Sequence, residues 1–367
     1  MSDIEPPTVG VEEEFLLVDP DTGTPLAVNA AVARAAAELG VELQLELSRC
    51  QVEVATGVAT AAGQLRTELR HLRHTVAHAA RRCDALLLAV AAPLFAPENF
   101  PVTATPRYER IAAQFGMLAR EPGICGCHVH VGVPDRETAV RVSNWLRVWL
   151  PTLLATTANS AVYRGVLTGY ASWRCILWRR WPSAGPPPHF ASEAHYDATV
   201  AMMRAAGTIL DDAMVYWDVR PSSRFPTVEI RVSDVPATVE ETVLVATLIR
   251  AAVAMAIREI RAERFGPPIE ADMLRAAYWK AAHDGLAGDH LDVRSGTIRP
   301  ARAQLELLLD YLAPALDTFG DTGWVAESVA AVLKRGNGAM RQTAAFGRNG
   351  NVGDVLAECA AATLAFD

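Results

Sequence analysis

Three short segments of the sequence each carry two charged or imidazole side chains with one residue between them. These pairs are Glu12 and Glu14, His128 and His130, and Glu229 and Arg231. Successive side chains on a β-strand point to opposite faces, so two residues separated by one share a face. We therefore predict that each segment is a strand with both polar groups on one side, and that Glu13 faces away from its two neighbours.

The residues around these pairs are mostly apolar, which predicts strands that are at least partly buried. A buried carboxylate without a partner is costly, so a cation or a charged substrate is the natural compensation. Each pair alone has a simpler explanation, because a Glu-x-Glu strand is typical of a solvated sheet face and a Glu–Arg pair of a surface ion pair. All three pairs together favour a common ion-binding site.

Two further carboxylates, Glu46 and Glu53, begin and end the segment Glu-Leu-Ser-Arg-Cys-Gln-Val-Glu. They are separated by an odd number of positions, so on a regular strand they would face opposite sides of the sheet. A β-bulge, or a position of Glu46 before the strand begins, would bring both carboxylates to the same face.

Oxygen donors dominate this set of side chains, which suits Mg²⁺ or Mn²⁺ and tolerates a single histidine. A zinc site would require more cysteine or histidine ligands. Cys125 and Cys127 fall on the opposite face of the histidine strand, so we interpret them as buried structural cysteines. His71, His74 and His78 recur at helical spacing in an arginine-rich stretch and are predicted to form an exposed helix face.

The sequence has no familiar glycine-rich motif for nucleotide binding. It contains neither Gly-x-x-x-x-Gly-Lys-[Ser/Thr] nor Gly-x-Gly-x-x-Gly, so the P-loop and Rossmann interpretations lose their main support. A nucleotide would instead have its phosphates held by metal ions and arginines, the general arrangement for phosphoryl transfer. The spacing of Arg231 beside Glu229 fits that role.

The polar pairs need a sheet to position them. Alternation and turn residues predict strands at residues 8–18, 42–54, 85–92, 124–133, 214–220 and 227–232. Helical spacing occurs at residues 29–39, 61–83 and 134–159, and again through most of the chain after about residue 237. Residues 163–190 form a long irregular segment, which in a compact domain tends to be functional. Strands followed by helices predict an α+β fold with an antiparallel sheet.

Composition and charge exclude several classes of protein. The 367 residues carry a net charge of −8 and no basic block, which argues against nucleic-acid binding. No apolar stretch approaches the roughly 20 residues needed to cross a bilayer, so no membrane association is expected. Residues 1–7 lack the layout of a signal peptide. Six scattered cysteines are typical of reduced thiols, and we therefore expect a cytoplasmic protein.

Several segments, in order along the chain, match one known family. They are residues 9–19, 46–53, 126–132, 169–174, 217–221, 227–236 and 341–342. Their combination resembles the carboxylate–amine ligases related to glutamate–cysteine ligase type 2. The resemblance implies that residues 1–367 form a single catalytic domain with a glutamine-synthetase-like α+β fold, in which a curved antiparallel sheet flanked by helices forms a funnel-shaped active site.

The resemblance also implies roles for individual residues. The metal ligands would be Glu12, Glu14, Glu46, Glu53, His128 and Glu229. Arg231 would hold the ATP phosphates with His130 on the same nucleotide side, and the catalytic residues would be Arg231, Glu53 and Glu229. Substrate contacts would come from Ser172, Arg174, Arg220, Arg341 and Gln342. Glu46 departs from the family pattern, since related ligases often have aspartate there.

The implied reaction uses ATP and Mg²⁺ to join a small-molecule carboxylate, glutamate or another amino acid, to an amine. ATP first phosphorylates the carboxylate, in glutamate ligases the γ-carboxylate, and the amine then displaces phosphate to form an amide. Two other interpretations remain open. One is a metal-dependent hydrolase of the amidohydrolase type, in which His-x-His strands also occur, and the other is a non-catalytic relative that only binds nucleotide. A homodimer is one of the quaternary states open to such a chain.

Overall fold

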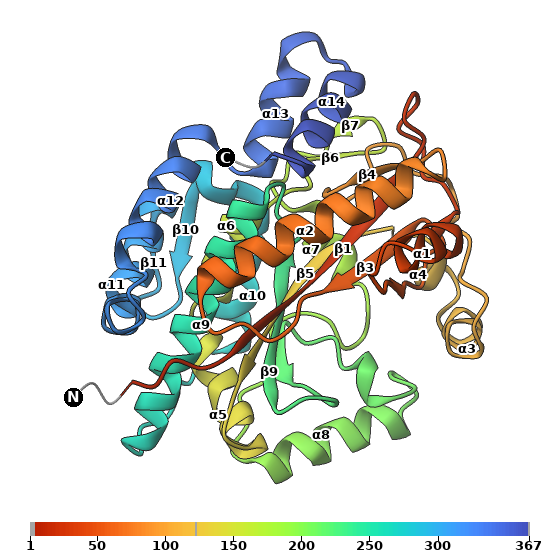
Figure 1. Ribbon diagram of the computed structural model, residues 1–367. Coiled ribbons are helices and arrows are strands. Elements are labelled where there is room, and N and C mark those ends of the chain that lie inside the picture. The colour runs from red at the N-terminus through yellow and green to blue at the C-terminus, as the bar shows by residue number, and fades with distance from the viewer. Residues whose placement is uncertain (1–3, 122, 366–367) are drawn as a thin grey trace.

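The computed structural model describes residues 4–121 and 123–365, and its centre is an antiparallel sheet of seven strands (Figure 1). Six strands follow the order β2–β3–β1–β5–β9–β8, and β4 pairs with β1 beside this path. The strands are β1 (Val9–Val18), β2 (Gln44–Leu45), β3 (Gln51–Ala55), β4 (Leu86–Leu88), β5 (Gly126–Gly132), β8 (Val219–Pro221) and β9 (Thr227–Asp234). The three segments with polar pairs are therefore the three central strands.

Strand pairing explains how the polar pairs come together. In the register of the sheet, Glu14 lies opposite Glu53 and Glu12 lies opposite His128. In the next strand pair, β5 with β9, His130 lies opposite Glu229. Directly opposed residues of antiparallel strands have their side chains on the same face, with Cβ atoms about 4.5–5.5 Å apart. Four strands therefore contribute carboxylates or imidazoles to one face of the sheet.

The other face of the sheet is mostly apolar and is covered by helices. Val11, Val129 and Ile230 belong to one hydrophobic core with residues of α9 (Val239–Arg261). The long helix α2 (Ala62–Arg81) lies beside α9 over this face (Figure 1). Nearly every residue of α9 is buried, since the sheet packs on one side of it and further helices on the other.

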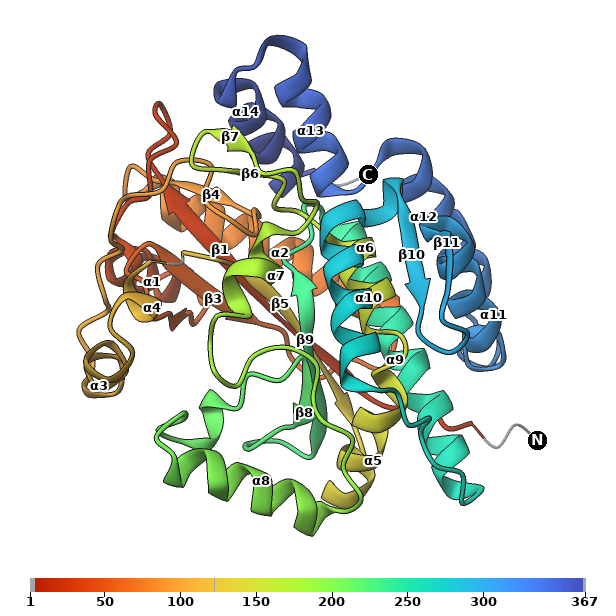
Figure 2. The same cartoon turned by 180° about the vertical axis from the view of Figure 1, so that it is seen from behind.

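A second group of elements borders the polar face. Figure 2 shows around this side α7 (Trp173–Trp178), α8 (Glu193–Ala205) and α10 (Ala271–Asp284). α3 (Pro106–Phe115), the short 3-10 helix η1 (Asp212–Met214) and residues near Trp181 share a hydrophobic cluster separate from the core under α9. The polar face is therefore bordered largely by the middle third of the chain, including most of the irregular segment.

The remaining elements complete the molecule. The other helices are α1 (Asn29–Ala37), α4 (Met117–Arg120), α5 (Arg136–Leu146), α6 (Leu150–Thr157), η2 (Gly285–Ala287), α11 (Ala301–Phe319), α12 (Thr322–Arg335), α13 (Gly338–Asn349) and α14 (Val352–Thr363). Two hairpins pair β6 (Val162–Tyr163) with β7 (Val166–Leu167), and β10 (Asp289–Asp292) with β11 (Thr297–Pro300). Among the described helices, none combines the length and apolar character that crossing a membrane requires.

Most of the predicted elements are confirmed, with shifted ends. The strand predicted at residues 8–18 and the helices predicted at residues 29–39 and 61–83 are β1, α1 and α2. The helix predicted at residues 134–159 is two helices, α5 and α6. Pro151 lies in the first turn of α6, where its missing backbone N–H is tolerated. In the interior of one continuous helix the same proline would break the helix.

Two predicted strands are largely wrong. In the segment 214–220, only Val219 and Arg220 pair in the sheet, because Met214, Val215 and Trp217 pack in the separate hydrophobic cluster with α3 and α8. The apolar run at residues 85–92 forms only the three-residue strand β4. In both segments tertiary packing outweighs the local preference for an extended chain.

The carboxylate of Glu13 points away from the polar face, as predicted, and is fully buried beneath it. Arg73 of α2 donates two hydrogen bonds to it, from Nε at 3.0 Å and from Nη2 at 2.5 Å. The hydroxyl of Thr242 donates a third at 2.7 Å. Arg73 also donates to the backbone carbonyls of Pro236 and Ala237. This buried ion pair therefore connects β1, α2 and the start of α9.

We predict that Arg73→Leu lowers the free energy of unfolding by about 3–5 kcal/mol, because it leaves the carboxylate of Glu13 buried without its partner. His71→Ala, on the exposed side of the same helix, is the matched control and should change this free energy by less than about 0.5 kcal/mol. Urea denaturation followed by circular dichroism measures both. A loss below about 1 kcal/mol in Arg73→Leu, the size typical of a surface pair, would contradict the assignment.

Candidate active site

The polar face of the sheet holds three overlapping groups of side chains that could each hold a metal ion. In each group, three ligand atoms lie within 4.8 Å of one another. The groups are Glu12, His130 and Glu229, then Glu12, Glu53 and His128, and finally Glu14, Glu46 and Glu53. Glu12 and Glu53 each belong to two groups, so the three form one continuous array, which we call the glutamate array.

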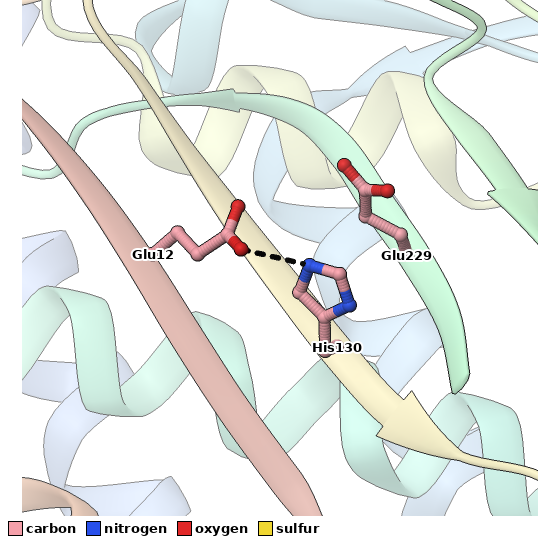
Figure 3. A group of neighbouring side chains, drawn as sticks. All are labelled: Glu12, His130 and Glu229. Carbon is pink, nitrogen blue, oxygen red and sulfur yellow. Dashed lines mark ion pairs between the residues drawn. The ribbon is translucent and has the colours of Figure 1, made fainter. Parts of the chain in front are cut away.

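The first group joins the three central strands (Figure 3). Glu12 comes from β1, His130 from β5 and Glu229 from β9. The Nε2 atom of His130 lies 3.3 Å from Oε1 of Glu12, and its Nδ1 atom lies 3.0 Å from the hydroxyl oxygen of Thr227. No described residue completes a hydrogen bond to this Nε2 atom. The atom therefore faces Glu12 and still lacks a hydrogen-bond partner.

His128 is more deeply buried and lies among three carboxylates. Its Nδ1 atom lies 3.1 Å from Glu12 and 3.9 Å from Glu53, and its Nε2 atom lies 3.7 Å from Glu14. Burial, and then the neighbouring charge of Arg231, lower the pKa of His128. A neutral imidazole has a nitrogen lone pair to offer, so this ring suits metal coordination.

Glu14, Glu46 and Glu53 form the most crowded part of the array. Burial and repulsion by Glu14 raise the pKa of Glu46 to about 8, with Arg231 opposing part of the shift. Burial and the charges of Glu46 and Glu12 raise the pKa of Glu53 well above its ordinary range. Glu46 follows β2 and lies before β3. This confirms the second explanation predicted from the sequence, that Glu46 precedes the strand that carries Glu53.

Arg231 is the main counter-charge within the array. It is ion-paired with Glu229, and its Nη1 atom lies 3.3 Å from Nδ1 of His128. The ladder between β5 and β9 is bulged between Cys127 and Val129, close to this side chain, and a bulge re-aims the side chains beside it. Its Nε atom is buried and has no hydrogen-bond partner among the described residues, so a donor remains for an anion.

Glu229 is held between two arginines. Arg220 forms a two-pronged contact with it, from Nε at 2.9 Å and from Nη2 at 3.2 Å, and Arg231 contacts the same carboxylate. Burial raises the pKa of Glu229, but the charges of Arg220 and Arg231 outweigh burial and hold that pKa well below its ordinary range. Glu229 is therefore a fixed, ionised carboxylate.

The charges of the array are unbalanced, with five carboxylates facing two guanidinium groups. Carboxylate oxygens with one or two imidazole nitrogens form a ligand set that suits hard divalent cations. Nε2 of His128 is buried without a hydrogen-bond partner in the described chain, and a buried polar atom of this kind calls for a ligand. The residues present therefore fit one or more divalent cations and, through them, phosphate oxygens.

Ser172 and Arg174 lie at a buried end of the polar face. The hydroxyl of Ser172 donates to Asp234 at 2.8 Å, and the same carboxylate accepts from the hydroxyl of Ser160. The guanidinium of Arg174 lies over Gly126, where a Cβ atom would be 2.4 Å from Nη2. Nε of Arg174 is buried and lacks a partner in the described chain. Ser172 therefore fixes the loop before α7, whereas Arg174 keeps a donor available to a ligand.

Arg341 and Gln342 of α13 contact other parts of the molecule. Arg341 lies 2.7 Å from Glu241 through Nη1 and 3.6 Å from Glu358 through Nε. Gln342 donates to the side-chain oxygen of Asn159 at 2.9 Å. Within residues 4–121 and 123–365, neither side chain is hydrogen-bonded or ion-paired to the glutamate array. The structure therefore gives both residues structural contacts and does not bring them into the site.

Three residues beside the array were not singled out from the sequence. Tyr216 packs its ring 6.0 Å from the guanidinium of Arg231. The hydroxyl of Tyr108 in α3 donates to the backbone carbonyl just before Glu46, at 2.9 Å. Asp218 is buried, and burial raises its pKa to about 6 against the charge of a nearby arginine. Asp218 lies inside the recognised segment 217–221, whereas no periodicity marks the two tyrosines.

The cysteines and the helical histidines behave as predicted. Cys125 and Cys127 are buried in apolar cores, and burial raises the pKa of each thiol well above its ordinary range. His71, His74 and His78 lie on the exposed side of α2. None of these five side chains belongs to the three groups of the glutamate array.

Proteins of known sequence place the chain in a family. Residues 8–358 match the family described as glutamate-cysteine ligase family 2. A protein of Nocardia farcinica (strain IFM 10152), described provisionally as glutamate–cysteine ligase 2-1, is 60% identical over 361 residues, which cover 98% of this chain and 94% of the relative. A similarly described glutamate–cysteine ligase 2-2 of Mycobacterium sp. (strain KMS) is 58% identical, covering 98% of this chain and 99% of the relative.

Two solved structures share the fold at 14% sequence identity. The glutamate–cysteine ligase of Francisella tularensis, solved in complex with AMP, aligns with a TM-score of 0.69 over 100% of this chain and 91% of its own. A bifunctional glutathione synthetase from Pasteurella multocida aligns with a TM-score of 0.68 over 97% of this chain, which spans 52% of that protein. These likenesses confirm the expected α+β fold, with an antiparallel sheet flanked by helices. This chain therefore belongs to glutamate-cysteine ligase family 2 and is a carboxylate–amine ligase, an enzyme that forms C–N bonds.

Proposed function

We propose that this ligase uses ATP and Mg²⁺ to form an amide, with a γ-glutamyl amide as the first candidate, through an acyl-phosphate intermediate. The glutamate array carries this proposal, since its three overlapping ligand groups face Arg231 on one side of the sheet. Carboxylate-rich sites bind hard cations, and such cations bind phosphate oxygens. Mn²⁺ fits the same ligands.

Four residues of the array, and Arg231 beside it, have distinct tasks in this proposal. Mg²⁺, when bound, neutralises charge on the phosphoryl oxygens and aligns the attacking carboxylate. Glu12 and Glu53 each serve two ligand groups, so they set the spacing between neighbouring sites. Glu229 keeps its carboxylate in one position between its two arginines. Arg231 directs its unpaired Nε donor toward a phosphate oxygen, and His130 lines the nucleotide side.

The reaction proceeds in two displacements. A carboxylate oxygen of the first substrate attacks the γ-phosphorus of ATP, and the bond to ADP breaks. The nitrogen of the amine then attacks the acyl carbon, phosphate leaves with the bonding electron pair, and the nitrogen gives up a proton. Positioning and electrostatics supply this catalysis, so no covalent nucleophile of the enzyme is required.

The comparisons support the substrates of this proposal. The names of the relatives favour glutamate, or another amino acid, as the carboxylate and a second amino acid as the amine. The AMP complex of the Francisella enzyme supports the use of a nucleotide. Arg174, with its unpaired Nε, is the substrate contact that the geometry supports best. We also treat residues 1–367 as one catalytic domain, because α9 shares its hydrophobic core with β1 and β5.

The hydrolase alternative fits the topology less well. An amidohydrolase would carry its His-x-His motif on an early parallel strand, with further histidine and aspartate ligands at the ends of later strands. Here the two histidines lie in the middle of an antiparallel sheet, with glutamate-bearing strands on both sides. The non-catalytic alternative makes a different prediction, which is nucleotide binding without turnover.

We predict that the protein forms ADP from ATP only with Mg²⁺ or Mn²⁺ and an amino-acid carboxylate present, and that hydroxylamine traps the activated acyl group as a hydroxamate. Mass spectrometry of products from a panel of amino acids and amines measures this. Amide cleavage without ATP would support the hydrolase instead. Binding of Mg-ATP with no ADP formed on any pair would support the non-catalytic relative.

We predict that Glu53→Gln and Glu229→Gln each reduce ADP formation by about a thousandfold, because each removes a charged ligand whose effect on the transition state is several kcal/mol. Coupled measurement of ADP release tests this, with circular dichroism to confirm that the variants are folded. Glu306→Gln on the surface of α11 is the matched control and should retain normal turnover. Near-normal rates in either array variant would overturn the metal assignment.

We predict that Mg²⁺ stabilises the protein through the array. At a free concentration about 100-fold above Kd, the free energy of unfolding should rise by about 2.7 kcal/mol. Thermal unfolding with Mg²⁺, compared with Na⁺ at equal ionic strength, measures the effect, and Glu306→Gln should show it in full. Glu53→Gln should show little of it, since Glu53 belongs to two ligand groups. An equal shift in both variants would place the cation elsewhere.

A further inference from the structure

The glutamate array is unevenly exposed, and this indicates the side from which a large ligand reaches it. The side chain of Glu12 is 19% exposed and is the most exposed of the array's ion-paired side chains, while His130, at 12%, is more exposed than His128, at 3%. Glu229 is 4% exposed. Arg174 covers Gly126 at the start of β5, the end away from His130. The array is therefore most open at Glu12, with His130 beside it, while Glu14, at 13%, keeps some exposure at the end covered by Arg174.

A short loop borders the open side. Residues 222–226 connect β8 to β9, and the hydroxyl of Ser222 accepts hydrogen bonds from the backbone N–H groups of Arg224 and Phe225. The backbone N–H of Thr227 donates to the carbonyl of Phe225 at 2.8 Å, and the N–H of Ser222 donates to the carbonyl of Thr227 at 2.9 Å. These contacts define the shape of the loop.

Phe225 is the exposed feature of this loop. The residue is 57% exposed, and its ring centroid lies 6.0 Å from that of His130 with the two planes at 89°. An aromatic ring left in solvent forgoes the stabilisation that burial would bring, and the neighbouring loop residues Ser222, Ser223 and Arg224 offer it no apolar cover. Phe225 is therefore exposed enough to be available to another flat group.

We infer that Phe225 is the platform on which the base of the bound nucleotide stacks. The inference rests on the proposed function, because it takes the phosphates to be held at Glu12, His130 and Glu229. The loop 222–226 contacts this group through Phe225 and His130, so the nucleoside extends from the phosphates toward that loop. A phenyl ring stacks on a nucleobase through its π-face, and every base has such a face.

We predict that Phe225→Ala raises the Kd of Mg-ATP about tenfold and leaves the Kd of Mg-tripolyphosphate, which has no base, unchanged. Phe225→Trp should restore binding of Mg-ATP to the level of the native protein, since indole is also a stacking surface. Calorimetric titration of each variant with a non-hydrolysable ATP analogue and with tripolyphosphate measures both constants. In turnover, Phe225→Ala should raise KM for ATP and change kcat little.

Phe265→Ala is the matched control, because Phe265 is 77% exposed and packs over Arg141, which lies outside the glutamate array. It should bind both ligands as the native protein does. If Phe225→Ala binds Mg-ATP normally, or weakens ATP and tripolyphosphate equally, the stacking role is wrong while the proposed function stands. If the native protein binds no Mg-ATP, the proposed function itself fails, and the stacking role with it.

Discussion

Repulsion among five carboxylates on one face of a sheet is the constraint on which the rest of this structure depends. Partial burial strengthens that repulsion, because charges interact more strongly away from water. Burial, and after it this repulsion, raise the pKa values of Glu46 and Glu53. Arg220 and Arg231 offset part of the charge, and both contact the same glutamate, Glu229. The other four carboxylates lie against one another and the two histidines, and in our proposal a bound cation balances their charge.

On the opposite face of β1, the charge of a buried glutamate is balanced in another way. Glu13 has a permanent partner in Arg73, and the pair is sealed under α2 and α9 with every oxygen of the carboxylate hydrogen-bonded. A buried pair of this kind is rarely a large net gain, but breaking it is expensive. Neighbouring glutamates of one strand therefore differ: Glu13 has a fixed counter-charge, whereas in our proposal Glu12 and Glu14 bind an exchangeable cation.

Strand alternation is the reason that much of this site could be predicted from the sequence. The period of two residues places Glu12 with Glu14 and His128 with His130 without knowledge of the fold, and the pairing of β1 with β5 then brings both pairs to one face. Glu46 lies between two strands, where that period does not apply. Arg73 lies among exposed histidines, but at a helical spacing of four after Leu69, which is on the buried side of α2. That spacing was the available signal for a buried arginine.

The buried end of the polar face depends on a different kind of interaction, and sequence periodicity does not detect it. Ser172 and Ser160 both donate to Asp234, and the backbone N–H of Ser172 donates to a carbonyl at the end of α10. Such contacts run between side chains and backbone in irregular segments, so they repeat at no interval. We propose that the regular strands carry the groups that bind ATP and its metal ions. In our proposal, the choice of carboxylate and amine falls to the irregular segment around Arg174, where one buried donor is still unpaired.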